Sequence, residues 1–181
     1  MRIKSVSSLL RPLLAGAMFA IATLPAHAVQ PGDAAPALSL PGTGGATVNL
    51  ADYKGHVVYL DFWASWCGPC KQSFPWMSDM QARYGVLGLK VVAVNLDAKQ
   101  ADADAFLAQF PNSALTIAFD SKGAAPAQYQ VKGMPTSFLI GADGRVLMVH
   151  QSFKDSDRQD LQARIVSALE DAAKNKVAAK Q

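Results

Sequence analysis

The sequence predicts a single α/β domain in which helices cover both faces of a mixed β-sheet. Apolar, β-branched runs of strand length alternate with helical segments along the chain, a pattern typical of parallel strands joined by helices. Near the end, two strand-like runs flank a glycine-containing turn, so part of the sheet should be antiparallel. The composition, 50% hydrophobic and 17% charged over 181 residues, is that of one globular domain and excludes a disordered chain.

Residues 1–28 are expected to form a secretory signal peptide. They contain three basic residues and no acidic one, then an apolar run from Leu13 to Leu24, then Ala26-His27-Ala28, which has the A-x-A form of a cleavage site. The apolar run is shorter than the roughly 20 residues of a membrane span, although retention as an uncleaved anchor is the alternative. We expect cleavage after Ala28, which places residues 29–181 in the periplasm, where disulfides persist.

Loss of this segment changes the charge balance of the protein. The whole chain has 17 Lys and Arg against 14 Asp and Glu, and removal of the three basic residues leaves the remainder neutral. A neutral domain lacks the basic surface that nucleic acid requires. We therefore expect no nucleic-acid partner.

The first half of the domain is expected to form a hairpin, two buried strands and a long helix. Prolines and glycines between residues 31 and 41 limit the opening segment to one short strand, and a glycine-rich turn at 42–45 leads to its partner. The third strand is apolar and aromatic, as buried parallel strands are, and Asp61 is its only ionisable residue. Apolar residues at helical spacing follow until Gly85. The expected ranges are strands at 37–40, 47–50, 57–62 and 89–96 and a helix at 69–84.

The second half is expected to add three helices and three strands. Pro111 should end the first of these helices, and Gly141-Ala142-Asp143-Gly144 should join the last two strands as a hairpin. The final helix is amphipathic, and the Lys-rich tail from Lys174 is expected to fray, which leaves an ordered core of about 32–173. The expected ranges are helices at 101–110, 123–129 and 155–173 and strands at 115–119, 137–140 and 145–150.

Cys67 and Cys70 are the only cysteines, and they lie where a buried strand is followed by a helix. A structural disulfide is one interpretation, but closing so short a loop contributes only about 1.9 kcal/mol, against about 4.7 kcal/mol for a loop of about 100 residues. A zinc site is disfavoured because only His56 and His150 remain as histidines beyond the signal peptide. Haem attachment would require a histidine in place of Lys71. We therefore expect no metal and no cofactor beyond the cysteine pair.

A reversible dithiol is the favoured interpretation of the pair. At the start of a helix, free backbone N–H groups and the helix dipole stabilise negative charge, so Cys67 should be held partly as the thiolate that attacks disulfides. Cys70, one turn inside the helix, is placed to resolve the resulting mixed disulfide. Pro69 suits the first helical turn because no hydrogen bond is lost there.

The residues around the cysteine pair, and a later proline-containing loop, resemble those of a known family. The run Asp61-Phe62-Trp63-Ala64-Ser65-Trp66-Cys67-Gly68-Pro69-Cys70-Lys71 resembles the thioredoxin active-site signature, and Gly133-Met134-Pro135-Thr136 resembles the thioredoxin loop that carries a cis-proline. The opening Pro31-Gly32-Asp33-Ala34-Ala35-Pro36 and an extra segment at about 98–122 are similar to those of the periplasmic TlpA-like thiol-disulfide reductases. The resemblance covers about 32–173 and implies a thioredoxin fold with an N-terminal hairpin extension and a central insertion.

The resemblance also implies roles for individual residues. Cys67 would be the attacking nucleophile and Cys70 the resolving thiol. Pro135, in the cis form, would face the disulfide and present the Met134 backbone to an extended substrate segment, and Trp66 would lie beside the reactive sulfur. The substrate-docking residues expected on this basis are Trp66, Gly68, Pro69, Met134 and Pro135.

Asp61 matches the buried acid of thioredoxins. Burial should raise the pKa of its carboxyl, which could then take the proton from Cys70 as the mixed disulfide resolves. The alternative is an acid at a strand end that simply reaches water. Ser73 is a departure, because many TlpA-like reductases devoted to cytochrome c maturation carry a glutamate there. His56 and His150 have no evident partner in the sequence and are expected to be structural.

Together these features predict a periplasmic thiol-disulfide oxidoreductase that works mainly as a protein-disulfide reductase through Cys67-Gly68-Pro69-Cys70. The expected partners are disulfides of other proteins and a membrane thiol electron donor of the DsbD or CcdA type, and the chain is expected to be a monomer. One alternative is a dithiol oxidase or isomerase. Another is a thiol reductant or metallochaperone-like factor in cytochrome c or copper-oxidase assembly.

Overall fold

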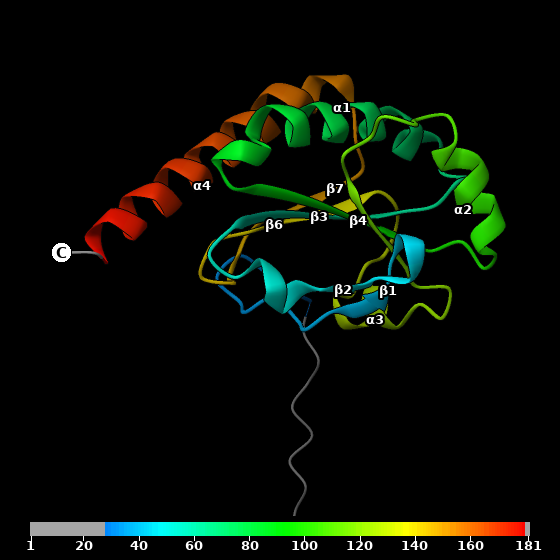
Figure 1. Ribbon diagram of the computed structural model, residues 1–181, viewed down its shortest axis with the longest axis horizontal. Coiled ribbons are helices and arrows are strands. Elements are labelled where there is room, and N and C mark those ends of the chain that lie inside the picture. The colour runs from blue at the N-terminus through cyan, green and yellow to red at the C-terminus, as the bar shows by residue number, and fades with distance from the viewer. Residues whose placement is uncertain (1–27, 180–181) are drawn as a thin grey trace, which may run out of the picture.

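A computed structural model describes residues 28–179 and contains a five-stranded sheet at its centre (Figure 1). The strand order is β5-β4-β3-β6-β7. The pairs β3–β4 and β4–β5 are parallel, whereas β3–β6 and β6–β7 are antiparallel, so the sheet is mixed as predicted. The strands are β3 (Val57–Trp63), β4 (Leu89–Asn95), β5 (Thr116–Phe119), β6 (Thr136–Ile140) and β7 (Val146–Gln151).

Helices and a small hairpin cover the two faces of this sheet. The helices α1 (Gly68–Tyr84) and α4 (Arg158–Ala178) lie side by side over one face, and α2 (Gln100–Leu107) lies at the end of that layer (Figure 1). The opposite face carries the antiparallel pair β1 (Ser39–Pro41) and β2 (Thr47–Asn49) together with α3 (Ala124–Gln128). This arrangement is a thioredoxin fold with an N-terminal hairpin.

The alternation of side chains along β3 divides the core into two layers. Tyr59 and Trp63 point into the cluster beneath α1, α2 and α4, and Leu60 and Phe62 point into the cluster beneath the hairpin and α3. Every residue of β3 is buried. The strand therefore runs through the interior of the domain, and the chain continues from its end directly into the segment that contains Cys67.

Local backbone chemistry explains how α1 is bounded. Cys67 has extended backbone geometry and caps the N-terminus of the helix. At the other end a single 3-10 turn, Gly85–Leu87, leads to Gly88, whose φ of +106° lies in the left-handed region that favours glycine. The chain reverses at Gly88 and enters β4, which runs parallel to β3. The start of α1 and the C-terminal ends of β3 and β4 therefore lie at the same edge of the sheet.

Two helix C-termini differ from the sequence prediction by three residues or more. The helix expected to reach residue 110 ends at Leu107: Ala108 makes the last i→i−4 hydrogen bond, to Asp104, and Gln109 and Phe110 form i→i−3 turns. The tail from Lys174, expected to fray, instead continues α4 to Ala178, so helical order extends beyond the expected limit of residue 173. These last residues are exposed, and alanine and lysine have high intrinsic helix propensity, which accounts for a helix that extends past its core contacts.

The expected signal peptide lies outside the described residues, apart from Ala28. Within residues 28–179, no helix combines the length and the apolar character needed to cross a membrane.

Candidate active site

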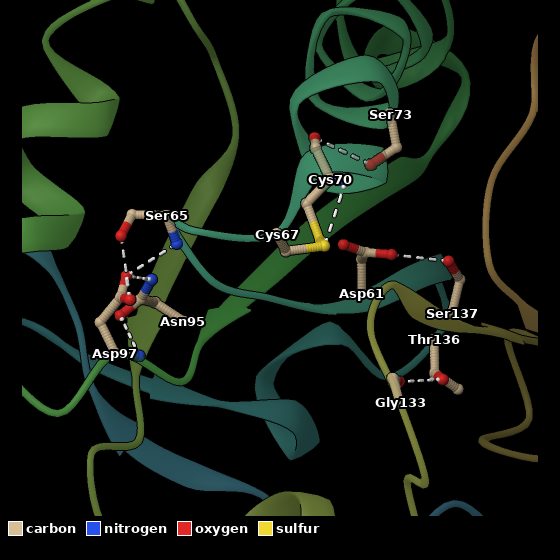
Figure 2. Close-up of a disulfide and its surroundings, with 10 residues drawn as sticks. All are labelled: Asp61, Ser65, Cys67, Cys70, Ser73, Asn95, Asp97, Gly133, Thr136 and Ser137. Atoms are coloured by element: carbon tan, nitrogen blue, oxygen red, sulfur yellow. Dashed lines mark hydrogen bonds between the residues drawn. A yellow bond between two sulfur atoms is a disulfide. The ribbon is translucent and has the colours of Figure 1, made fainter.

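Cys67 and Cys70 form a disulfide at the first turn of α1 (Figure 2). Cys67 is the N-cap residue of the helix, and its Sγ accepts the backbone N–H of Cys70 at 3.2 Å. Pro69 occupies the first turn. A thiolate at Cys67 would therefore accept the Cys70 N–H and face the positive end of the helix dipole, both of which favour the charged form.

The two cysteines differ in their exposure to solvent. Cys70 is completely buried, whereas Cys67 retains 5% exposure beside Gly68 and Pro69, both of which are exposed. Trp66 is 71% exposed, which is unusual for a large aromatic side chain. Of the two cysteines, only Cys67 has any exposed surface, and it directly follows the exposed indole of Trp66 in the chain.

The loop before β6 has the cis Met134–Pro135 peptide bond that the resemblance implied. Thr136 Oγ1 donates a hydrogen bond to the Gly133 carbonyl at 2.7 Å, and the Pro135 carbonyl accepts the backbone N–H of Ser152 at 2.8 Å. Thr136 pairs with Phe62 near the end of β3, so this loop lies at the edge of the sheet where the chain enters Cys67. Met134 is half-buried against the α1-side core.

Asp61 is completely buried, so the alternative of an acid that reaches water is wrong. It lies between Tyr59 and Trp63 on the β3 face that α1 covers, because those residues contact Trp76 and Phe74 of the helix. Burial raises the pKa of the Asp61 carboxyl to about 7, and a hydrogen bond from Ser137 opposes this effect. In Figure 2 one carboxylate oxygen points toward the disulfide and the other accepts from Ser137 at 2.6 Å.

A second buried carboxylate, Asp97, supports the segment before Cys67, and the sequence analysis missed it. It accepts hydrogen bonds from the Ser65 backbone N–H and hydroxyl, both at 3.0 Å, and from the Asn95 side-chain amide at 2.7 Å. This contact ties the Trp63–Cys67 segment to the end of β4 (Figure 2). The sequence does carry a signal, since two polar residues, Asn95 and Asp97, follow the apolar run from Val91 to Val94.

Three other residues lie near the cysteines in the sequence, and the structure shows where each side chain packs. Trp63 is buried in the core and stacks with Phe74 and Phe106. Ser73, at the position where many TlpA-like reductases have glutamate, is buried and donates its hydroxyl hydrogen bond to the Cys70 carbonyl at 3.2 Å. Lys71 is exposed to solvent.

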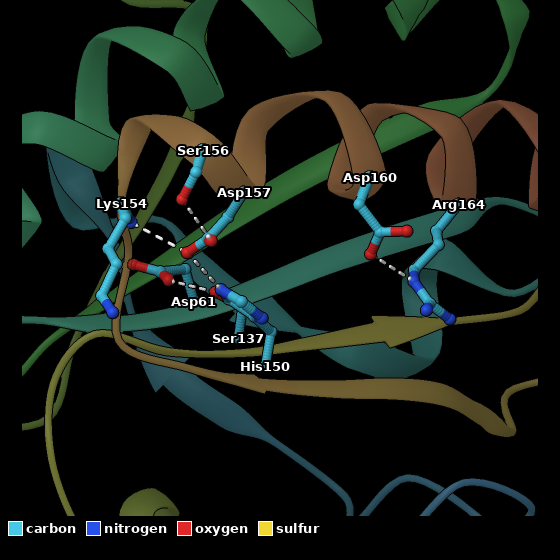
Figure 3. Close-up of polar contacts among 8 residues, drawn as sticks. All are labelled: Asp61, Ser137, His150, Lys154, Ser156, Asp157, Asp160 and Arg164. Carbon is cyan, nitrogen blue, oxygen red and sulfur yellow. Dashed lines mark hydrogen bonds and ion pairs between the residues drawn. The ribbon is translucent and has the colours of Figure 1, made fainter.

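His150 has a partner that the sequence did not reveal. Its Nε2 lies 3.3 Å from Asp157 Oδ2, in the 3-10 turn that precedes α4 (Figure 3). The sequence shows no evident partner for His150 because the two residues meet only when β7 packs beneath the start of α4. His56 lies at the other end of β3, before Val57, and its Nδ1 is buried without a hydrogen-bond partner. Across residues 28–179, no group of three or more histidine, cysteine or acidic residues is arranged to hold a metal ion.

A disulfide that caps a helix, with one accessible cysteine and a cis-proline loop in a thioredoxin fold, defines a thiol-disulfide oxidoreductase. The chain belongs to the redoxin family, whose model matches residues 30–165. A thiol-disulfide oxidoreductase ResA from Oceanobacillus iheyensis is 33% identical over 159 residues, which cover 84% of this chain and 82% of that protein. The ResA of Bacillus subtilis is 32% identical over 123 residues, 68% of either chain. A Chlorobium tepidum crystal structure, provisionally named a thiol:disulfide interchange protein DsbE, is 57% identical with a TM-score of 0.76 and covers 78% of this chain and 99% of that one.

Proposed function

We propose that this oxidoreductase reduces disulfides of other proteins in the periplasm. The observation that carries the proposal is the unequal exposure of the two cysteines: Cys67 keeps 5% exposure next to the exposed Trp66, whereas Cys70 is completely buried. A protein partner would form a mixed disulfide with Cys67 alone, and Cys70 would then resolve it from within.

Each turnover transfers two electrons to the substrate. The Cys67 thiolate attacks one sulfur of the substrate disulfide, forms a bond to it and releases the other sulfur as a thiolate that takes a proton from water. Cys70 then attacks Cys67 Sγ, so that the Cys67–Cys70 bond forms while the bond to the substrate breaks. The substrate disulfide is reduced and the cysteine pair is oxidised.

Asp61 is the proposed acceptor of the Cys70 proton during resolution. A neutral thiol is a poor nucleophile, so a base must take its proton as the sulfur attacks. Asp61 is the buried carboxyl beneath the first turns of α1, and its pKa, raised by burial to about 7, is suited to accepting and releasing a proton near neutral pH.

The Gly-Pro pair between the cysteines supports the reducing direction, because reducing thioredoxins share it. Their potential is near −270 mV, against about −120 mV for the strong oxidant DsbA. In an oxidising compartment, the Cys67–Cys70 disulfide of a reductase must be reduced again after each turnover, and a membrane thiol donor would supply the two electrons. The expected signal peptide supports the periplasmic location, and the first residue of the protein isolated from a periplasmic extract would test it.

A trapping experiment tests this function. Cys70→Ser should accumulate mixed disulfides through Cys67 that dithiothreitol releases. The matched control is Cys67→Ser, which keeps only the sealed Cys70 and should trap nothing. Equal adducts in the two variants, or none in Cys70→Ser, would contradict the proposal.

The trapped proteins also decide between substrate classes. Haem-binding or copper-binding proteins among them would favour a role in cytochrome c or copper-oxidase assembly. The potential of the wild-type pair, measured against glutathione, decides the direction: a value close to that of DsbA would favour an oxidase.

A further inference from the structure

Asp61 has no direct contact with solvent, because its side chain is completely buried. Its Oδ1 accepts the Ser137 hydroxyl hydrogen bond, and its Oδ2 has no hydrogen-bond partner. If Asp61 takes a proton from Cys70 in every turnover, the role proposed above, it must release that proton before the next turnover. The proton therefore needs a route out of the core.

Three adjacent strands place Asp61, Ser137 and His150 in one row across the sheet. Asp61 of β3 is opposite Ser137 of β6, and Ser137 is opposite His150 of β7. Directly opposed residues share one face of a sheet, with Cβ atoms about 4.5–5.5 Å apart. Asp157 continues the row, since its Oδ2 lies 3.3 Å from His150 Nε2. Figure 3 shows these residues beneath the first turns of α4.

Exposure to solvent increases along this row. Asp61 and Ser137 are buried, whereas the side chains of His150 and Asp157 are 25% and 26% exposed. His150 carries an imidazole ring, which can accept a proton at one nitrogen and release one from the other. The Nε2 atom of His150 is itself buried, so the row reaches solvent through the exposed part of the His150 ring and through Asp157.

Few other ionisable groups face the row. Tyr59 of β3 is buried, and desolvation, then the nearby Asp61, hold its pKa far above the ordinary range, so it keeps its proton. β4 places Ala93 opposite Asp61, and α1 contributes the Cys70 sulfur. At the outer end, desolvation raises the pKa of Asp157, but hydrogen bonds from the Lys154 backbone, Ser156 and His150 outweigh it and hold that pKa below its usual value. Asp157 is therefore held as an anion at the outer end of the row.

The geometry points to a proton path that runs from Asp61 through the Ser137 hydroxyl to His150 and Asp157. Ser137 and His150 act on the exchange reaction through Asp61, as positioning residues that carry its proton away.

The transfer balances without any further reactant. The Cys70 proton binds Asp61 Oδ2, and rotation of the carboxyl group brings it to the Ser137 side. Ser137 Oγ accepts this proton as it gives its own hydroxyl proton to His150 Nε2. His150 then releases the proton of its other ring nitrogen, Nδ1, to water, because Nε2 is buried, so that Asp61 is again a carboxylate, Ser137 a hydroxyl and His150 a neutral imidazole.

The test measures the resolution step by itself. A mixed disulfide between Cys67 and glutathione is held at acid pH, where the Cys70 thiol is protonated, and is then brought to neutral pH while tryptophan fluorescence is followed. His150→Ala should slow resolution on the order of tenfold, less than the 10²–10⁴-fold contribution of a directly acting base, and added imidazole should restore the rate. Ser137→Ala should slow it similarly, whereas Ser137→Thr, which keeps the hydroxyl, should not. His56→Gln, a histidine outside the row, is the matched control and should resolve at the wild-type rate.

Three outcomes separate this path from the role of Asp61 itself. Wild-type rates in His150→Ala and Ser137→Ala, with Asp61→Asn slow, would overturn the path and leave the proton-acceptor role intact. A slow His150→Ala that imidazole fails to rescue, together with a slow Ser137→Thr, would show a structural effect and also overturn it. A wild-type rate in Asp61→Asn would refute both the acceptor role and the path.

Discussion

Replacement of Asp61 by asparagine should stabilise the folded, oxidised protein at alkaline pH. The pKa of this carboxyl rises from 3.8 to about 7 on folding because burial disfavours its charged form. The folded state therefore binds more protons than the unfolded state between these two values, and the free energy of unfolding falls as the pH rises through that window. Above the window, the full cost of keeping a buried carboxylate is about 4 kcal/mol at 1.36 kcal/mol for each pKa unit.

The pH dependence separates this cost from the other effects of the substitution. Asparagine keeps an oxygen that can accept from Ser137, but its buried NH₂ group lacks a partner, at a cost of about 1–3 kcal/mol that does not vary with pH. Relative to Asp61→Asn, the wild-type protein should lose about 2–3 kcal/mol of stability between about pH 5 and pH 8.

Urea unfolding of the two oxidised proteins at both pH values measures this difference. The slope m should be the same for both, because the surface exposed on unfolding is unchanged. A stability difference that stays constant with pH would refute the conclusion that Asp61 is held in a desolvated site.

Two further substitutions probe the surface and the support of the disulfide. Trp66→Ala should reduce the second-order rate constant for a protein disulfide on the order of tenfold, because exposed indoles contribute strongly to docking, without lowering the melting temperature; an unchanged rate constant would exclude Trp66 from the docking surface. Asp97→Ala should cost about 2–3 kcal/mol in urea unfolding, because it leaves the part-buried donors of Ser65 and the buried amide of Asn95 unpaired. Its matched control is Asp79→Ala, which removes an exposed ion pair with Arg83 and should change stability by less than about 1 kcal/mol. Equal losses in the two variants would contradict the supporting role of Asp97.

Most of the fold could be predicted from local patterns. The apolar run at 57–62 predicted the central strand, and its observed extension to Trp63 adds one more buried residue. Helical spacing and Gly85 predicted α1 almost residue for residue. The prediction that the chain frays from Lys174 was wrong. It assumed that a helix needs core contacts, whereas the intrinsic helix propensity of alanine and lysine extends α4 to Ala178.

The partners of the polar residues could not be predicted in the same way. Asp61 and Ser137 are 76 residues apart in the chain and meet only because β6 pairs antiparallel with β3. Ser65 and Asp97, which are 32 residues apart, meet where β3 and β4 end together.

The sequence by itself determined the chemistry that is local: two cysteines three residues apart, a proline in the first helical turn, and a strand that delivers them to the start of a helix. Only the tertiary structure decided how that chemistry is tuned. The pKa of Asp61 depends on how completely α1 and the sheet exclude water from it, and the His150–Asp157 contact depends on where α4 packs. Backbone propensity acts over a few neighbouring residues, whereas desolvation and charge interactions depend on distances in space, which exist only once the chain has folded.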